Sequence, residues 1–243
     1  MRALSVPDLL AVWERGLAQS PTERALLMLA TACPDLSVQE LAKLSIGQRD
    51  DRLLTLREWA FGSQLVSIVD CPNCGDRLEL DFTIADIRVP SSPDVATEHS
   101  LEVEGYRVKF RLPNSEDLTA IATQDPQTAP QLLLKRCLLE TTAQKSTPPF
   151  DQLPETVLND VVAQMALADP QAEIKLAVTC PGCGHAWKSV FDIVAYFWEE
   201  LNVWALRLLR EVHILASAYG WREADILAMH PYRRQLYLEM VGR

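Results

Sequence analysis

The sequence has few glycines and histidines, and it lacks the motifs by which many enzymes are recognised. Its 243 residues include nine glycines and four histidines. It contains no Gly-x-Ser-x-Gly, no phosphate-binding glycine loop, no His-Glu-x-x-His and no dinucleotide-binding fingerprint. Isolated carboxylates such as Glu199-Glu200 are typical of a solvated helix face. We therefore expect a protein that is not an enzyme. A catalytic set of carboxylates or histidines scattered along the chain is the alternative.

Basic residues are also in short supply. Aspartate and glutamate outnumber lysine and arginine by 33 to 23, which gives a net charge of -10. Nucleic-acid-binding modules normally present a basic face, so we expect no nucleic-acid partner. The sequence has no apolar run of about 18 residues, and Asp8, Glu14 and Arg15 come too early for a signal peptide. We expect a cytoplasmic protein that does not insert into a membrane.

Four of the six cysteines form two nearly identical motifs. The first is Cys71-Pro72-Asn73-Cys74-Gly75, and the second is Cys180-Pro181-Gly182-Cys183-Gly184. An apolar run precedes each motif and an alternating run follows it, which predicts two strand–turn–strand knuckles. A tight turn lets two sulfurs converge. The glycine after the second cysteine permits a positive φ and lets backbone N–H groups point at the thiolates.

The four knuckle cysteines are predicted to form one tetrahedral metal site, with Cys71, Cys74, Cys180 and Cys183 as ligands. Zn2+ suits four thiolates, and iron in a rubredoxin-like site takes the same ligand set. Because four thiolates leave no open coordination position, the metal would be structural rather than catalytic.

A single four-cysteine site has three alternatives. In the first, each knuckle is a half-site completed by another chain; in the second, His185 replaces one cysteine; in the third, the cysteines form redox pairs. A redox Cys-x-x-Cys normally lies at a helix N-terminus, whereas both pairs here lie between predicted strands.

The hydrophobic patterns predict an α+β fold that is mostly helical, in three segments. Residues 1–62 show four short amphipathic helices, with capping-box starts at Ser37 and Ser45 and an end at Gly62. Residues 63–191 hold the two knuckles as a small antiparallel, zinc-ribbon-like β unit with an inserted hairpin and helices. Residues 192–243 are again helical, with a break at Gly220.

The insertion between the knuckles is predicted in more detail. A hairpin is expected around Gly105, and prolines indicate loops at residues 90–93 and 145–149. One helical segment is expected from Pro113 to about Leu139 with a break near Pro126, and a second helix over residues 154–168. The two remaining cysteines lie in apolar helical patterns and are expected to be buried; they are Cys33 and Cys137.

Tryptophan, tyrosine and arginine gather in the C-terminal helices. One interpretation packs the rings into a compact helical core. The other assigns a partner-binding surface, because these residue types are favoured at interfaces. Its candidate residues are Trp221, Tyr232, Arg233, Arg234 and Tyr237.

Two groups of short motifs carry a family resemblance. The N-terminal group is Trp13-Glu14-Arg15-Gly16, Glu23-Arg24-Ala25-Leu26, Ile46-Gly47-Gln48-Arg49-Asp50, Leu56-Arg57-Glu58 and Phe61-Gly62. The C-terminal group is Glu211-Val212-His213-Ile214-Leu215-Ala216, Tyr219-Gly220-Trp221, Ile226-Leu227, Arg233-Arg234 and Tyr237-Leu238. Over most of the chain, they resemble a family of zinc-knuckle proteins encoded in phage-tail-like contractile injection gene clusters. The C-terminal part alone is also similar to baseplate hub assembly proteins of T4-like contractile phages.

The resemblance implies a non-enzymatic structural or assembly component of a contractile baseplate. Its partners would be other baseplate and hub proteins, and its location would be the cytoplasm or an assembled injection particle. The resemblance does not separate a permanent component from an assembly chaperone. The alternative is a zinc-ribbon adaptor that mediates protein or nucleic-acid interactions outside a phage-tail system, and the charge of -10 argues against the nucleic-acid form.

Overall fold

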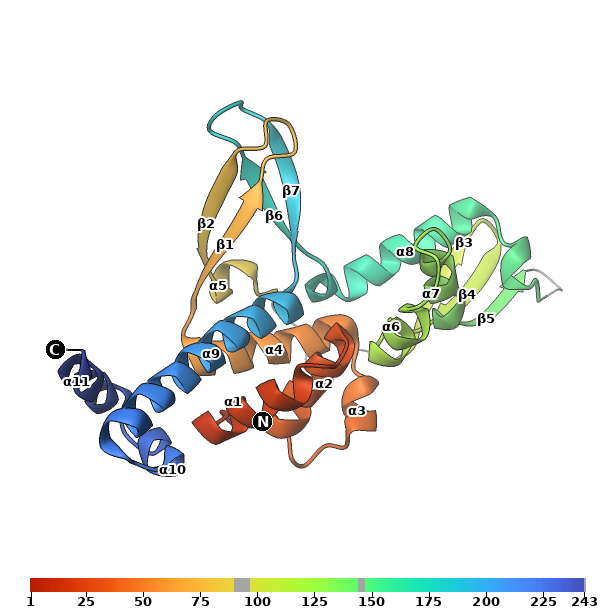
Figure 1. Ribbon diagram of the computed structural model, residues 1–243. Coiled ribbons are helices and arrows are strands. Elements are labelled where there is room, and N and C mark those ends of the chain that lie inside the picture. Colours follow the sequence, from red (N-terminus) through yellow and green to blue (C-terminus); the bar gives the residue numbers. More distant parts are fainter. Residues whose placement is uncertain (90–96, 144–146, 243) are drawn as a thin grey trace.

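The computed structural model describes residues 1–89, 97–143 and 147–242, which form four parts (Figure 1). A helical base carries a spur of two β-hairpins, an insertion body lies beside the spur, and a C-terminal arm extends from the base. The expected α+β class, mostly helical with small antiparallel sheets, is confirmed. The loop predicted at residues 90–93 lies outside the described residues, as does the first part of the loop predicted at 145–149.

The helical base consists of four helices and the first half of a long fifth one. Their bounds are α1 (Val6–Gly16), α2 (Pro21–Ala32), α3 (Val38–Ala42), α4 (Ile46–Phe61) and α9 (Ile193–Tyr219). Capping boxes start α3 at Ser37 and α4 at Ser45, as predicted, and also start α1 and α2. Gly62 ends α4 with a φ of 91°, a conformation that favours glycine.

The core of the base lies where α1, α2 and α4 pack against α9. Gly16 permits this approach, because a Cβ there would lie 2.5 Å from the ring of Trp198. The core includes Met28, Leu29, Leu53, Leu54, Phe197 and Leu201. It joins the first predicted segment, residues 1–62, to the beginning of the third. The three-segment division of the sequence stays a prediction.

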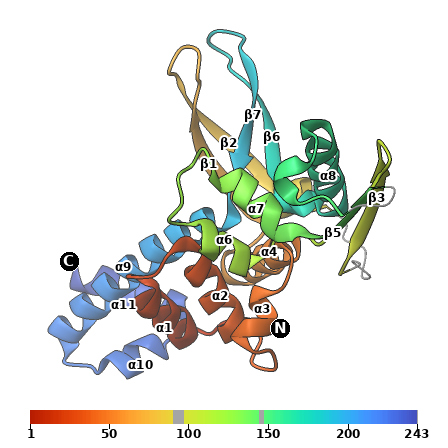
Figure 2. The same cartoon turned by 90° about the vertical axis from the view of Figure 1, so that its right-hand side faces the viewer.

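The spur consists of two antiparallel hairpins that form separate sheets. The first pairs β1 (Gln64–Asp70) with β2 (Arg77–Thr83), and the second pairs β6 (Ile174–Thr179) with β7 (Ala186–Phe191). Figures 1 and 2 show both hairpins rising from the base on the same side. Their feet join the core of the base, while side chains higher up, such as Ile68, are exposed.

One pair of aromatic rings and one tyrosine hydroxyl hold the feet of the hairpins. Phe82 of β2 meets Phe191 of β7 edge to face, with ring centroids 5.5 Å apart. The Tyr196 hydroxyl on α9 accepts a hydrogen bond from the Val66 N–H at 3.0 Å and donates one to the Val66 carbonyl at 3.2 Å. These contacts link the two hairpins to each other and the first hairpin to α9.

The insertion body follows the first hairpin and has a hydrophobic core of its own. The short α5 (Ile84–Ile87) follows β2 and packs into the core of the base. The elements of the insertion body are β3 (His99–Val103), β4 (Tyr106–Phe110), α6 (Ser115–Ile121), α7 (Ala129–Cys137), β5 (Leu138–Ala143), a 3-10 turn η1 (Phe150–Gln152), α8 (Glu155–Ala168) and a second turn η2 (Pro170–Ala172). Its core includes Val108, Phe110, Cys137, Val157 and Val161. Cys33 in the base and Cys137 here are both buried, as expected.

One prediction for the insertion is wrong. The helical segment was expected to reach Leu139, but α7 ends at Cys137 and residues Leu138–Ala143 form β5. This strand pairs with β4 and turns the expected hairpin around Gly105 into a three-stranded sheet. The β-branched Thr141 and Thr142 favour a strand, and no glycine or proline marks the change from helix to strand.

The insertion body is attached to the beginning of α4. The Ile46 N–H donates to the Pro113 carbonyl at 3.1 Å, and the Gly47 N–H donates to the Asp169 carboxylate at 2.9 Å. A Cβ at position 47 would lie 1.9 Å from an oxygen of that carboxylate, so glycine is needed for the close approach.

The C-terminal arm begins where α9 leaves the base. Gly220 ends α9 in the left-handed conformation, as predicted, and α10 (Glu223–Leu227) and α11 (Pro231–Val241) fold back onto the end of α9. Although α9 is long, no helix within the described parts of the chain has the length and apolarity to cross a bilayer.

Candidate metal centre

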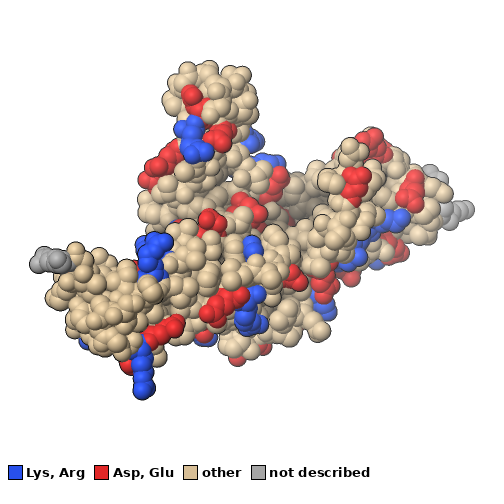
Figure 3. All heavy atoms as spheres, viewed as in Figure 1, with Lys and Arg blue, Asp and Glu red and all other residues tan. Residues whose placement is uncertain are grey.

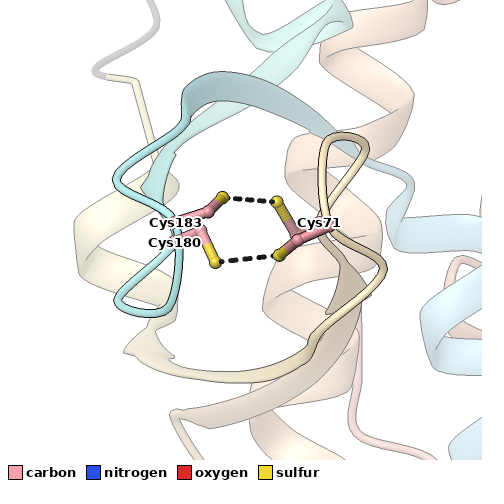
Figure 4. Close-up of side chains that lie close together, drawn as sticks. Cys71, Cys180 and Cys183 are labelled. Atoms are coloured by element: carbon pink, nitrogen blue, oxygen red, sulfur yellow. Dashed lines mark hydrogen bonds between the residues drawn. The ribbon is translucent and has the colours of Figure 1, made fainter.

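The tips of the two hairpins bring four cysteines together. Figure 4 shows Cys71 facing Cys180 and Cys183 from the opposite loop. The Cys71 and Cys183 sulfurs are 3.7 Å apart, and the Cys74 and Cys180 sulfurs are 3.6 Å apart. All four sulfurs lie within 4.8 Å of one another. The predicted cysteines therefore form one cluster, although more than 100 positions separate the two motifs.

The two knuckles have the same backbone hydrogen bonds. The Cys71 N–H donates to the Asp76 carbonyl, and the Gly75 N–H donates back to the Cys71 carbonyl. In the second knuckle, Cys180 bonds to His185 and Gly184 to Cys180 in the same way, with distances of 2.8 and 2.9 Å in both knuckles. Gly75 and Gly184 have φ values of 77° and 72°, as the sequence predicted. Each tight turn thus aims two sulfurs inward.

The spacing of the sulfurs fits a tetrahedral metal ion. Four sulfurs placed about 2.3 Å from a central Zn2+ ion would lie about 3.8 Å from one another, close to the two short distances seen here. Cys71 and Cys180 are buried against the hairpins, whereas Cys74 and Cys183 lie at the surface. The four side chains can hold a metal ion, and they fill every position of a tetrahedral site.

The clustered thiols shift one another's pKa values in opposite directions. The Asn73 side chain and the His185 N–H lower the pKa of Cys183 to about 6, because they donate to its sulfur. At Cys74, the Asp76 N–H acts to lower the pKa, but lost hydration and the three neighbouring thiols outweigh it and raise that pKa. Four thiolates repel one another at this distance, and a divalent cation removes that repulsion.

The alternatives to a four-cysteine site find less support in this geometry. Each pair of cysteines lies in a loop between strands, not at the N-terminus of a helix, where a redox pair is usual. His185 stacks on Trp187, with ring centroids 5.9 Å apart, and it is not part of the cluster. Both knuckles belong to the same chain and complete each other.

The predicted partner-binding residues of the C-terminal arm fall into two sets. Tyr232 and Arg233 are exposed. Arg234 is buried and donates from Nε to Glu211 at 2.8 Å. The rings of Trp221 and Tyr237 are partly buried and pack edge to face, with centroids 4.8 Å apart. A compact cluster of rings and an exposed surface therefore occur together, and partner binding stays a prediction.

One exposed feature of the arm was not singled out from the sequence. Tyr232, Leu236 and Met240 lie four positions apart on α11 and are 69%, 38% and 61% exposed. Residues at this spacing share one helix face, so they form an apolar stripe that points away from the arm's own core. The spacing is visible in the sequence, but the choice between the inner and outer face required the structure.

Comparison with known protein families gives a match that covers most of the chain. A family model described as T4 bacteriophage base plate protein matches residues 8–198. The matched residues contain most of the base, the whole spur with its four cysteines, and the insertion body. Most of α9 and the rest of the C-terminal arm lie beyond the match, so the similarity of this part to hub assembly proteins stays a prediction. No curated protein and no solved structure matches the chain.

Proposed function

The chain belongs to the family described as T4 bacteriophage base plate protein, and we propose that it serves the baseplate of a contractile, phage-tail-like injection system. In this proposal it is a non-enzymatic structural or assembly component, and its partners are other baseplate and hub proteins. It folds in the cytoplasm and acts there or within the assembled particle. The observation that carries the proposal is the family match over residues 8–198.

We further propose that Cys71, Cys74, Cys180 and Cys183 hold a structural Zn2+ ion. The support is the spacing of their sulfurs and the fact that four thiolates leave no open coordination position. When bound, the ion supplies a rigid link between the tips of the two hairpins and no reactive ligand. The spur would thereby become a stiff projection suited to a fixed place in an assembly.

The C-terminal arm supplies the proposed docking surface. Its apolar stripe of Tyr232, Leu236 and Met240 is exposed, and a helix of a partner protein can cover such a face. Arg233 lies beside the stripe and is exposed as well. Arg234 and Trp221 pack within the arm, so their substitution would test the fold of the arm rather than docking.

The proposal is tested by deleting the gene and complementing it with a tagged chain. We expect the deletion strain to lack complete particles, and the tagged chain to restore them. Mass spectrometry of the purified particles then separates the two roles: a component is retained, and an assembly chaperone is required but absent. The proposal would be overturned if the deletion strain made normal particles and the tagged chain were absent from the particles of the complemented strain.

A paired variant addresses the docking surface. Tyr232→Ala/Met240→Ala is expected to fold normally but to restore few particles. Leu167→Ala is the matched control, because Leu167 is 73% exposed and lies on α8, far along the chain from the stripe. Equal complementation by the double variant and the control would show that the stripe does not dock a partner.

A further inference from the structure

A groove lies where the insertion body meets the base and the spur. It has a volume of about 670 Å³, and we call it the junction groove. One wall comes from α7 and α8, and the other comes from the end of β7. Its apolar lining includes Leu133, Leu134, Val162, Met165, Val190 and Phe191. Figure 3 shows the hollow between the spur and the insertion body, with acidic side chains nearby.

The apolar walls continue out of the groove onto the surface. Val162 on α8 is 49% exposed, and Val190 on β7 is 62% exposed. A soluble chain gains little from two exposed valines that face a common hollow, unless another molecule covers them. The walls come from different hydrophobic cores, and pockets between separately packed bodies are common binding sites.

The polar part of the lining is strongly acidic. Among the described residues that line the groove, four carry carboxylates, whereas one carries a guanidinium. The acidic residues are Asp50, Asp169, Glu173 and Asp192, and the basic one is Arg49. Arg49 is only 5% exposed and bonds to Asp50 at 2.8 Å. The one internal cation is thus already paired, and the lining keeps an excess of negative charge.

The position of Asp50 makes this excess unfavourable in the free protein. Burial, with added repulsion from Asp192 and Asp169, raises the pKa of Asp50 to about 6 against the attraction of Arg49. Asp50 and Asp192 each use one carboxylate oxygen in the hydrogen bonds between described residues. A second oxygen on each remains for an N–H donor of a ligand.

We propose that the junction groove binds a segment of a partner protein in which a lysine or arginine side chain is flanked by apolar side chains. The cation would lie against Asp50 and Asp192, and the apolar side chains would cover Val162 and Val190. This inference goes beyond the proposed function, since it concerns a second surface and does not depend on the particle to which the partner belongs.

The experiment uses three labelled peptides of equal length and the full chain. One alternates leucine with lysine, one alternates leucine with glutamate, and one alternates serine with lysine. Fluorescence anisotropy is expected to show that the leucine–lysine peptide binds about tenfold more tightly than either of the others, because both charge and apolar contact are required. An alkylammonium ion, n-hexylammonium, serves as a competitor that lacks the peptide backbone.

Matched variants locate the binding site. Asp192→Asn keeps the oxygen that caps α9 and leaves the buried pair of Arg49 and Asp50 intact, so the fold is retained while one charge of the lining is removed. This variant and Val162→Ser are each expected to weaken binding by about tenfold. Glu79→Gln/Asp151→Asn removes two exposed charges elsewhere, and Leu167→Ser removes an exposed apolar side chain from α8 outside the groove. These two controls are expected to bind the peptide as the unaltered chain does.

Three results would overturn the proposal. Equal binding of the serine–lysine peptide would indicate only attraction to the net charge of -10. Equal weakening by the controls and the groove variants would place the peptide elsewhere on the surface. Binding of n-hexylammonium as tight as that of the peptide would assign the groove to a small amphiphile rather than to a protein segment.

Discussion

The Cys71 sulfur lies 3.7 Å from the sulfur of Cys183, although the two residues are 112 positions apart. The second short distance, from Cys74 to Cys180, also crosses from one hairpin to the other. Neither hairpin can therefore complete the site alone. A metal ion at this point would link two sheets that share no strand pairing.

Replacing one of these ligands should remove the link. We expect Cys74→Ser to bind less than one equivalent of Zn2+ and to lose about 3 kcal/mol of stability, which lowers the Tm by roughly 6–12 °C. Metal analysis after gel filtration and thermal unfolding measure both effects. Cys33→Ala is the control, because this buried thiol lies in the core of the base and should leave the metal content unchanged. Full metal content and an unchanged Tm for Cys74→Ser would refute the single-site interpretation.

Removal of the metal should loosen the spur but not the base. Two-stranded hairpins are marginally stable alone, whereas α4 and α9 share a large hydrophobic core. After treatment with a chelator, hydrogen exchange should quicken in the strands of the spur and stay slow in α4 and α9. Added Zn2+ should restore slow exchange. If exchange quickens equally in both helices, the base itself depends on the metal.

Arg57 of α4 and Glu200 of α9 form an ion pair, and replacing one or the other should cost different amounts of stability. Arg57 is 3% exposed and Glu200 is 29% exposed, and the guanidinium bonds both carboxylate oxygens. Glu200→Leu leaves a buried cation without its partner and should cost about 3 kcal/mol. Arg57→Met leaves a carboxylate that can reach water, so it should cost less, about 1–2 kcal/mol.

Urea unfolding of the two variants and of the double variant provides the measurement. The double variant should be more stable than Glu200→Leu alone, because no buried charge is left unpaired. Costs that simply add in the double variant would show that the two side chains do not stabilise each other.

Asp117 should make the insertion body less stable at low pH. Burial alone would raise the pKa of Asp117, but hydrogen bonds from Arg111, from the Asn114 N–H and from Arg136 outweigh burial and lower it. The unfolded chain therefore binds the proton more readily than the folded one. The stabilisation is present above the ordinary Asp pKa of about 4 and is lost as the pH falls further.

Asp117→Asn tests this dependence directly. We expect it to cost about 3 kcal/mol at neutral pH, since it leaves two arginines without a buried anion, and to flatten the decline in stability below about pH 4. Thermal unfolding over a pH series measures both effects. Asp151→Asn is the control, because the Asp151 side chain is 78% exposed. An unaltered pH profile for Asp117→Asn would assign the acid sensitivity to other carboxylates.

The cluster of four cysteines was the most predictable part of the molecule. A Cys-x-x-Cys-Gly motif between two strand-like runs determines its own turn, so Gly75 and Gly184 have the backbone conformation that the sequence predicts. The capping boxes and the end of α9 at Gly220 also depend only on residues that are neighbours in the sequence, so they could be predicted as well. That the two knuckles meet was inferred from their similarity and from the need for four ligands.

Features that depend on distant partners were harder to predict. Arg233 and Arg234 are adjacent and chemically alike, but the second is buried because Glu211 of α9 lies 2.8 Å away. β5 follows α7 without a breaking residue and exists because β4 offers it an edge. The junction groove has walls from parts of the chain that are far apart in sequence, so no single stretch indicates it.

In the sequence, the insertion body lies between the two hairpins of the spur. β2 leads into the insertion body and β6 leads out of it, so both hairpins of the spur lie at its borders. A single cut within residues 99–143 would leave two fragments, of which one holds α1 to α4 with the first hairpin and the other holds the second hairpin with α9. The shared core and the four sulfurs would hold the two fragments together in one complex. The two fragments should therefore be able to assemble when they are made as separate polypeptides.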